Sequence, residues 1–372
     1  MTITNFSELQ SKTINFLRFP LMLMVVFIHD EHLEINMQIL TTKTLQMKTL
    51  YTIIVNLGHY TLTQIAVPCF FMFSGFLFFY KTTEFSKTQY FDKLKKRIKT
   101  LLIPYLLWNI LAICVPLAGA LKNGELATFW TNLSEKGFFS IFLNYTSWKS
   151  MTGQIYFGPA LLPLWFLRDL ILTVILSPVI YHIVKYTKIL GIIGLGLLYY
   201  FKIGVIIVDY NLNQLVVAIF FFALGSYFSI NEKNIISSLR KVQIFGLPIS
   251  LISLGFSVYF YQTDIFQYIL PIYVVSGIIT IVNITSLLIE RNKIKEIDLL
   301  SKASFFIYLS HTILILGLSR VFLNKIIPFD NYIALTIIYL LTPFLCVSVC
   351  VALYFLLHKF LPKLTEIIVG GR

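Results

Sequence analysis

Two residues near the start of the chain, Arg18 and His29, are suited to chemistry on an anionic substrate. They lie eleven residues apart. In a helix that spacing is about 20° past three full turns, with a rise of about 16–17 Å, so both side chains face the same side. Arg18 can hold an anionic group, and His29 can transfer a proton near neutral pH. The alternative is that Arg18 reaches lipid phosphates and His29 makes interfacial hydrogen bonds beside Asp30.

Three more polar side chains, Arg168, Asp169 and His311, fall within long apolar runs. Charged groups inside a membrane span cost roughly 2.5–3.5 kcal/mol by insertion scales, so each ionisable residue there marks a candidate site. Arg168 and Asp169 are adjacent and point about 100° apart, so we expect each to need a partner on another helix or loop. They either form structural pairs or line a polar cavity near His29. His311 is either a core imidazole or a group that binds substrate in that cavity.

A cationic run precedes a further apolar segment. It holds five cations in seven residues, namely Lys93, Lys95, Lys96, Arg97 and Lys99. Such a cluster beside a membrane span binds anionic lipid and fixes topology. It would equally attract a phosphate-rich substrate, so both interpretations stay open at this stage.

The composition excludes a water-soluble protein. Of the 372 residues, 57% are hydrophobic and 13% are charged, and the mean hydropathy is +0.80. Soluble domains carry about 25% charged residues. The formal net charge of +13 therefore does not indicate a nucleic-acid-binding surface, and no nucleic-acid partner is expected. The four cysteines lie in apolar stretches without metal-ligand spacing, so we predict neither a metal site nor a disulfide.

Ten apolar runs, separated by polar segments, are candidates to cross a hydrocarbon layer of about 30 Å. Their expected ranges are 14–30, 62–80, 101–120, 163–184, 188–201, 212–230, 243–261, 267–289, 304–323 and 332–357. With both termini in the cytoplasm, the inner segments carry 20 Lys and Arg residues and the outer segments carry 8, as the positive-inside rule predicts. We therefore predict an all-α, polytopic integral membrane bundle of about ten transmembrane helices in the cell membrane. Residues 1–372 are expected to form one transmembrane domain, with no appended soluble domain.

Five segments, taken in order, resemble motifs of the membrane-bound acyltransferase 3 family. Arg18 and His29 form the first motif, an Arg-x10-His signature. The five segments are 15–29 (NFLRFPLMLMVVFIH), 67–79 (VPCFFMFSGFLFF), 95–108 (KKRIKTLLIPYLLW), 164–170 (LWFLRDL) and 304–311 (SFFIYLSH). The chain departs from the family pattern at Thr100, because many relatives carry a second arginine three positions after the one at Arg97. Lys99 can replace the charge of that arginine but not its planar fork.

The resemblance implies transfer of an acyl group, with acetyl as the expected group, from cytoplasmic acyl-CoA to a hydroxyl. The implied acceptor is a cell-surface polysaccharide, a lipopolysaccharide or a related glycan. Acyl-CoA would act as a co-substrate, and no permanently bound cofactor is expected. Membrane lipid and a glycan or glycolipid are the expected partners.

The resemblance also implies roles for particular residues. His29 would be the catalytic base, with Arg18 as its required partner. Asp30, Glu31 or Asp169 would orient the imidazole, and the sequence does not choose among them. The expected binding residues for acyl-CoA are Arg18, Lys95, Lys96, Arg97 and Lys99. The expected binding residues for the acceptor are Asp30, Ser74, Trp165, Arg168, Asp169, Tyr308 and His311.

A competing interpretation is an exporter of polysaccharide or lipid-linked sugar that transfers no acyl group. In that case Arg18, His29, Arg168, Asp169 and His311 would line a permeation or proton path. Many transporters are built from internal repeats. None is detectable in this sequence, which argues against the exporter.

Overall fold

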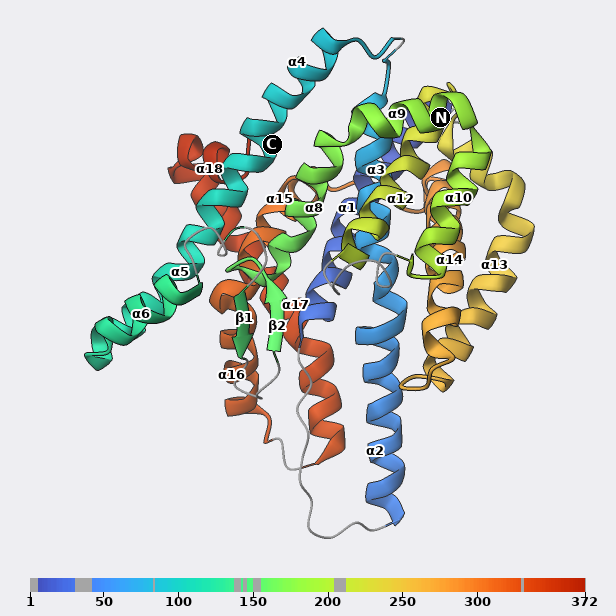
Figure 1. Ribbon diagram of the computed structural model, residues 1–372. Coiled ribbons are helices and arrows are strands. Elements are labelled where there is room, and N and C mark those ends of the chain that lie inside the picture. Colours follow the sequence, from blue (N-terminus) through green and yellow to red (C-terminus); the bar gives the residue numbers. More distant parts are fainter. Residues whose placement is uncertain are drawn as a thin grey trace.

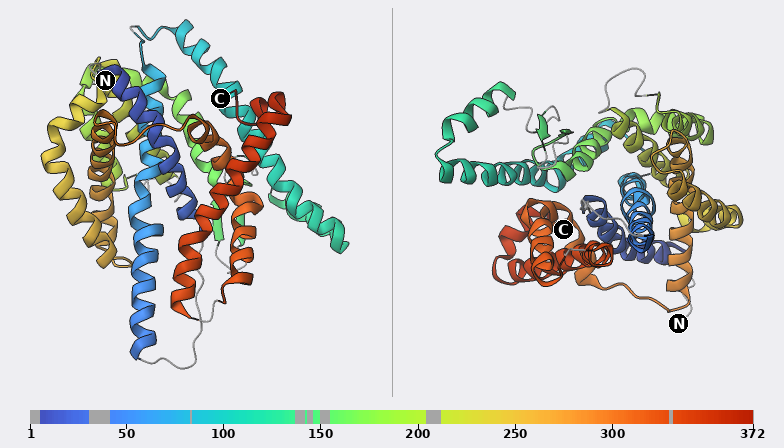
Figure 2. Two further views of the ribbon diagram at one scale, coloured as in Figure 1. Left: turned by 180° about the vertical axis from the view of Figure 1, so that it is seen from behind. Right: turned by 90° about the horizontal axis from the view of Figure 1, so that it is seen from below.

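The computed structural model describes residues 6–30, 42–82, 84–136, 142, 146–149, 155–203, 212–328 and 331–371. Helices dominate these residues and pack as one bundle (Figure 1). Viewed from below, α1 (Phe6–His29) and α3 (Ala66–Phe79) lie in the middle of the bundle (Figure 2). Most of the buried hydrophobic side chains belong to one core around these two helices. Residues on α1 are therefore placed to face the interior rather than lipid.

Within the described residues, seven helical segments are long and apolar enough to cross a membrane. The first three are α1; α2 (Thr42–Val55) with η1 (Asn56–Thr61), η2 (Leu62–Ile65) and α3; and α4 (Lys87–Arg97) with η3 (Ile98–Leu102) and α5 (Ile103–Asn123). The other four are α13 (Ile235–Tyr259); α14 (Phe266–Glu290); α15 (Asp298–Ser310) with η5 (His311–Ile315) and α16 (Leu316–Ile326); and α17 (Tyr332–Phe360). An eighth crossing would be η4 (Leu162–Leu164) and α8 (Trp165–Ile175) followed by α9 (Ser177–Thr187), which are bent by 64°. The chain is a multi-pass membrane protein.

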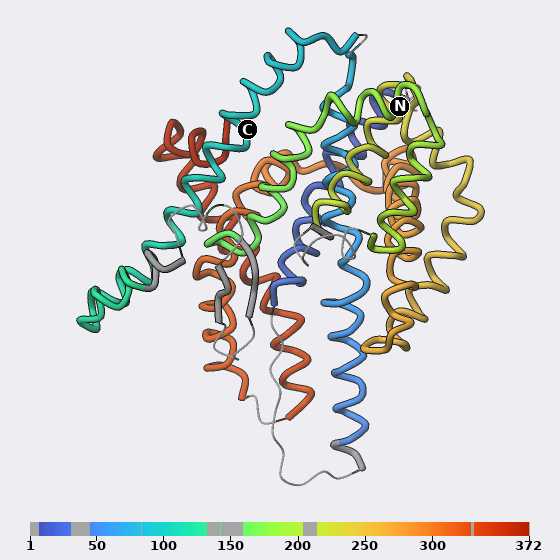
Figure 3. Tube along the Cα trace, viewed as in Figure 1, coloured from blue at the N-terminus to red at the C-terminus, as the bar shows by residue number. Residues whose placement is uncertain are grey.

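The ten predicted runs all fall on helices, but three of them are not single long helices. Run 163–184 is the bent pair of α8 and α9. Runs 188–201 and 212–230 coincide with the shorter helices α10 (Ile189–Tyr200) and α12 (Leu212–Ile230). A count of about ten crossings therefore stays a prediction. The N- and C-terminal ends of the traced chain lie at the same end of the bundle (Figure 3), and the assignment of that end to the cytoplasm also stays a prediction.

Outside the bundle, the chain forms a few short elements. They are α6 (Leu126–Lys136), the strands β1 (Thr146–Lys149) and β2 (Ile155–Gly158), and the C-terminal α18 (Pro362–Ile368). The two strands pair antiparallel, with Thr146 opposite Gly158. This hairpin is an addition to the predicted all-α class and does not alter the helical bundle.

Two glycines bring α3 and α12 into backbone contact. A Cβ on Gly75 of α3 would collide with the carbonyl oxygen of Phe222 on α12, and a Cβ on Gly225 of α12 would collide with that of Met72 on α3. Small residues at such crossings let helix backbones approach closely in a membrane, where van der Waals packing drives association. The crossing fixes α3 against α12 and so fixes the face that α3 presents to α1.

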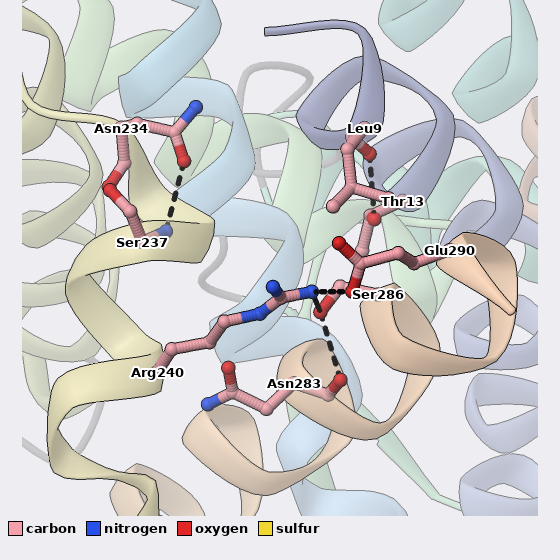
Figure 4. Close-up of polar contacts among 8 residues, drawn as sticks. All are labelled: Leu9, Thr13, Asn234, Ser237, Arg240, Asn283, Ser286 and Glu290. Carbon is pink, nitrogen blue, oxygen red and sulfur yellow. Dashed lines mark hydrogen bonds and ion pairs between the residues drawn. The ribbon is translucent and has the colours of Figure 1, made fainter. Parts of the chain in front are cut away.

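Polar contacts join the ends of α13 and α14 (Figure 4). Arg240 Nη2 on α13 donates to Glu290 Oε2 on α14 at 2.8 Å and to Ser286 Oγ at 3.3 Å. Asn234 Oδ1 caps the start of α13 by accepting from Ser237 N at 3.0 Å. Because α13 exposes most of its surface outside the bundle, this ion pair and cap define where the helix begins and how it meets α14.

We predict that Gly225→Ala destabilises the bundle by about 2 kcal/mol or more, because the added methyl group forces the two backbones apart. Gly255→Ala on α13 is the matched control, since nothing lies within 4 Å of a Cβ built there. In that control the alanine should leave stability unchanged or raise it, because alanine favours a helix over glycine by about 1 kcal/mol. Thermal unfolding midpoints in detergent measure both. Equal midpoints for the two variants would contradict the close crossing.

Candidate active site

Arg18 and His29 line one cavity. The cavity has a volume of about 870 Å³, and α1 contributes Ile14, Arg18, Met22, Val25, Ile28 and His29 to its wall. Steps of three and four residues place these side chains on one helical face. The prediction that Arg18 and His29 share one face of a helix is therefore confirmed, since both side chains line the same cavity.

Arg18 faces this cavity without a partner. The guanidinium makes no hydrogen bond or ion pair with any described residue, although Glu296 lies close enough to act on its charge. Arg97, from the junction of α4 and η3, also lines the cavity, and its guanidinium lies 5.8 Å from the ring centroid of Phe78. Two arginines that face an otherwise apolar space are suited to bind an anion, because a guanidinium binds phosphate or carboxylate through two parallel hydrogen bonds.

His29 is held by its backbone and by a second histidine. His29 Nδ1 lies 2.8 Å from Val25 O, one helical turn earlier, and 3.4 Å from His311 Nε2. The two ring centroids are 5.1 Å apart and the planes meet at 66°. A carbonyl oxygen only accepts, so Nδ1 of His29 carries the proton. The other nitrogen, Nε2, keeps its lone pair. Since His29 lines the cavity and its hydrogen bonds with the described residues all use Nδ1, the lone pair of Nε2 is available to a ligand.

His311 is fully buried and supports His29 rather than lining the cavity. Its Nδ1 lies 2.9 Å from Ile307 O and 3.0 Å from Tyr308 O, so it too carries its proton on Nδ1. Its Nε2 is then an acceptor for the Nδ1–H of His29. His311 opens η5, a π-helical turn, and such turns occur often at functional sites. Sequence reasoning placed His311 among the residues that bind substrate, and the structure places it behind the other imidazole instead.

Asp30 also lies outside the cavity wall. Its carboxylate is 1% exposed and forms an ion pair with Arg320 of α16. One residue beyond His29, it points to a different face of α1, which explains why it meets α16 and not the cavity. It ties the end of α1 to the helix that follows the π turn. Glu31, the other acid expected to orient His29, lies outside the described residues.

The expectation that Arg168 and Asp169 each need a partner elsewhere is wrong. They pair with each other: Arg168 Nε and Nη2 both lie 2.7 Å from Asp169 Oδ1. The long side chain of Arg168 bends back along α8 to reach Asp169. The prediction considered only the directions of the Cβ atoms and so did not include this reach. Asp169 is fully buried and Arg168 is 8% exposed. Neither lines the cavity, although Asp169 Oδ2 and Arg168 Nη1 have no hydrogen-bond partner among the described residues.

The other predicted residues divide between cavity and surface. Ser74, Trp165 and Tyr308 line the cavity, and Tyr308 Oη donates to Pro163 O at 2.7 Å. Among the described residues, Arg97 is the only cation of the run 93–99 that lines the cavity. Its other members are used or exposed: Lys93 Nζ donates to Phe78 O at 2.5 Å, Lys99 pairs with Glu366 at 3.2 Å, and Lys95 and Lys96 are exposed. A binding role in the cavity for Lys95, Lys96 and Lys99 is therefore not supported by their positions.

Sequence reasoning missed seven polar residues of the cavity wall. Two are serines, Ser301 and Ser304, and the others are Gln64, Lys202, Gln214, Gln267 and Lys302. The search considered ionisable residues inside apolar runs, whereas the three glutamines are neutral and the two lysines stand at or beyond the ends of those runs. A search for carboxamides within the predicted spans would have found all three glutamines. Among the described lining residues, four are cations and none is an acid, so the cavity favours an anionic ligand.

Comparison with known proteins places the chain in a family. A family model described as an acyltransferase domain, of the acyltransferase 3 type, matches residues 11–357. The chain therefore belongs to this family. A curated relative, the succinoglycan biosynthesis protein ExoH of Rhizobium meliloti (strain 1021), is 25% identical over 324 residues, which cover 84% of this chain and 80% of the relative. No solved structure matches.

We predict that Asp169→Asn lowers the free energy of unfolding by about 3 kcal/mol, because it leaves the buried guanidinium of Arg168 uncompensated. The control is Glu8→Gln, which removes an exposed pair with Lys12 and should change stability by less than about 0.5 kcal/mol. Equilibrium unfolding in mixed micelles measures the free energy of unfolding of both variants and of the wild type. A loss for Asp169→Asn no larger than the control's would show that the buried pair adds no stability.

Proposed function

We propose that this protein transfers an acyl group, with acetyl as the expected group, from cytoplasmic acyl-CoA to a hydroxyl of a cell-surface polysaccharide, lipopolysaccharide or related glycan. The reaction would take place within the cell membrane. The observation that carries the proposal is the presence, in one cavity, of Arg18 and of an imidazole whose Nε2 lone pair is free, with neither group bonded there to any described residue. Family membership and the similarity to a succinoglycan biosynthesis protein support acyl transfer to a polysaccharide.

The donor fits the end of the cavity that holds Arg18, Arg97 and Lys302. Coenzyme A carries several phosphates at one end and its thioester at the end of a long flexible arm. With the phosphates at the cations, the arm would follow the stripe of α1 from Arg18 toward His29, a rise of about 16–17 Å. The apolar residues between them, Met22 and Val25, offer a path without competing charges.

The transfer then needs a single proton carrier. His29 Nε2 takes the proton of the acceptor hydroxyl as its oxygen forms a bond to the thioester carbon. The bond from that carbon to sulfur breaks, and the imidazolium returns the proton to the thiolate, which leaves as free CoA. Throughout, Nδ1–H of His29 donates to Val25 O and toward His311 Nε2. These acceptors fix the tautomer and stabilise the positive charge that develops on the ring.

The first test is His29→Ala, which should lower acyl transfer about 10²-fold to 10⁴-fold, because general base catalysis contributes a factor of that size. The control is His182→Ala, an exposed histidine on α9. Mass analysis of surface glycan measures the acyl content. The glycan should still reach the surface without acyl groups. Full acylation in His29→Ala would contradict the role of His29 as base, and glycan trapped inside the cell would favour the exporter.

The second test concerns the donor. Arg18→Leu should raise the KM for acyl-CoA by about tenfold or more, since a charge-assisted hydrogen bond contributes about 1.5–3 kcal/mol. Arg18→Lys should recover part of this loss, because lysine restores the charge but not the planar fork. Arg291→Leu, an exposed residue after α14, is the control. An unchanged KM in Arg18→Leu would remove Arg18 from the donor site.

A further inference from the structure

Three glutamines from three separate segments line the cavity that contains His29. Gln64 belongs to η2, Gln214 to the first turn of α12 and Gln267 to the first turn of α14. A search for ionisable groups passes over them, and neither the motifs nor the family match assigns them a role. Their convergence from distant parts of the sequence is a property of the fold alone.

The three carboxamides have hydrogen-bonding capacity that the protein leaves unused. Gln214 Oε1 is buried and has no partner among the described residues. Gln267 makes no side-chain hydrogen bond with them either. Gln64 Nε2 donates to His59 O at 2.8 Å, which leaves its carbonyl oxygen available. Buried polar groups in native proteins are nearly always paired, so unused groups at a cavity wall indicate a polar ligand.

Their place along the cavity separates them from the donor cations. α1 runs from the end of the bundle near the N-terminus toward its middle. α12 and α14 run in the opposite direction, α12 from the middle of the bundle and α14 from nearer its far end (Figure 1). Gln214 and Gln267 stand at those beginnings, on the side where α1 ends at His29. Arg18 lies eleven residues before His29 on α1, and Arg97 lies beside the ring of Phe78 near the end of α3. Gln214 and Gln267 therefore lie toward the end of α1 that carries His29, and so does Lys202, the lining cation that follows α10 (Figure 1).

The chemistry of this end fits a sugar. A carboxamide both donates and accepts, as does each hydroxyl of a sugar ring, and no lining residue here is an acid that would select for a cation. Phe266, next to Gln267 in the chain, adds aromatic surface, and Trp165 lines the same cavity. Sites that hydrogen-bond substrate hydroxyls reject analogues without them, because the buried polar groups are then left unpaired.

We infer that Gln64, Gln214 and Gln267 form the acceptor subsite, which binds the hydroxyls of the sugar that receives the acyl group. This inference rests on the proposed acyl transfer and adds to it the residues that select the acceptor. The subsite presents the reacting hydroxyl to His29 Nε2 from the side opposite the thioester. The acceptor oxygen thus forms its bond to the acyl carbon while the bond to sulfur breaks, and the proton passes through His29 to the departing thiolate.

The test separates binding of the acceptor from use of the donor. The full-length protein in lipid nanodiscs is given acetyl-CoA or succinyl-CoA, with and without surface polysaccharide from cells that lack the protein, freed of esters by mild alkali. Thiol release without glycan reports hydrolysis, in which water replaces the acceptor. Acyl groups on the glycan report transfer. The variants are Gln214→Leu, Gln267→Leu and the double variant, and the control is Gln46→Leu, an exposed residue of α2.

The double variant should transfer acyl groups to subsaturating glycan about tenfold more slowly, because two hydrogen bonds are lost, while its thiol release without glycan stays within about twofold of wild type. Retained thiol release also shows that the variant is folded. Transfer within about twofold of wild type would overturn the subsite, and so would a parallel loss of both signals in the double variant. If wild-type protein shows neither signal with either donor, the proposed acyl transfer fails and the subsite fails with it.

Discussion

The hydrogen bond between His29 Nδ1–H and the carbonyl oxygen of Val25 is the contact on which the site depends. It fixes which nitrogen carries the proton and turns the other nitrogen toward the cavity. It needs an unbroken last turn of α1, and it needs His311 Nε2 to be an acceptor. The latter follows from two backbone carbonyls at the end of α15. Three backbone carbonyls thus set the proton positions of two imidazoles, and no carboxylate of the described residues forms a hydrogen bond with either ring.

Much of this could be predicted from the sequence where local periodicity decides the outcome. Arg18 and His29 share a face because both belong to one helix, and the helical period needs no tertiary information. The ten apolar runs fall on helices for the same reason. The number of membrane crossings is harder to predict from the sequence, because hydropathy does not reveal the bend between α8 and α9 or the short length of α10.

The features of the site that the sequence did not predict depend on contacts between distant segments or on flexible side chains. Lys93 and Lys99 were expected at a phosphate site, but a carbonyl at the end of α3 and a glutamate on α18 bind them. Arg168 reaches its own neighbour because three methylene groups give it a range that Cβ directions do not describe. The glutamines drew no attention in the sequence because a neutral carboxamide near a helix end is common, and only the fold brings three of them together.

The π turn at η5 links two features that are far apart in the sequence. A π turn holds one residue more than an α turn, so α16 follows α15 about 100° out of phase with an unbroken helix. Arg320 therefore faces Asp30 because of the extra residue in the turn that begins at His311, the neighbour of His29. If residues 311–315 formed a regular α-helix with every residue retained, Arg320 would rotate by about 100° away from Asp30. The position of the ion pair therefore depends on the backbone form of the same turn that begins at His311.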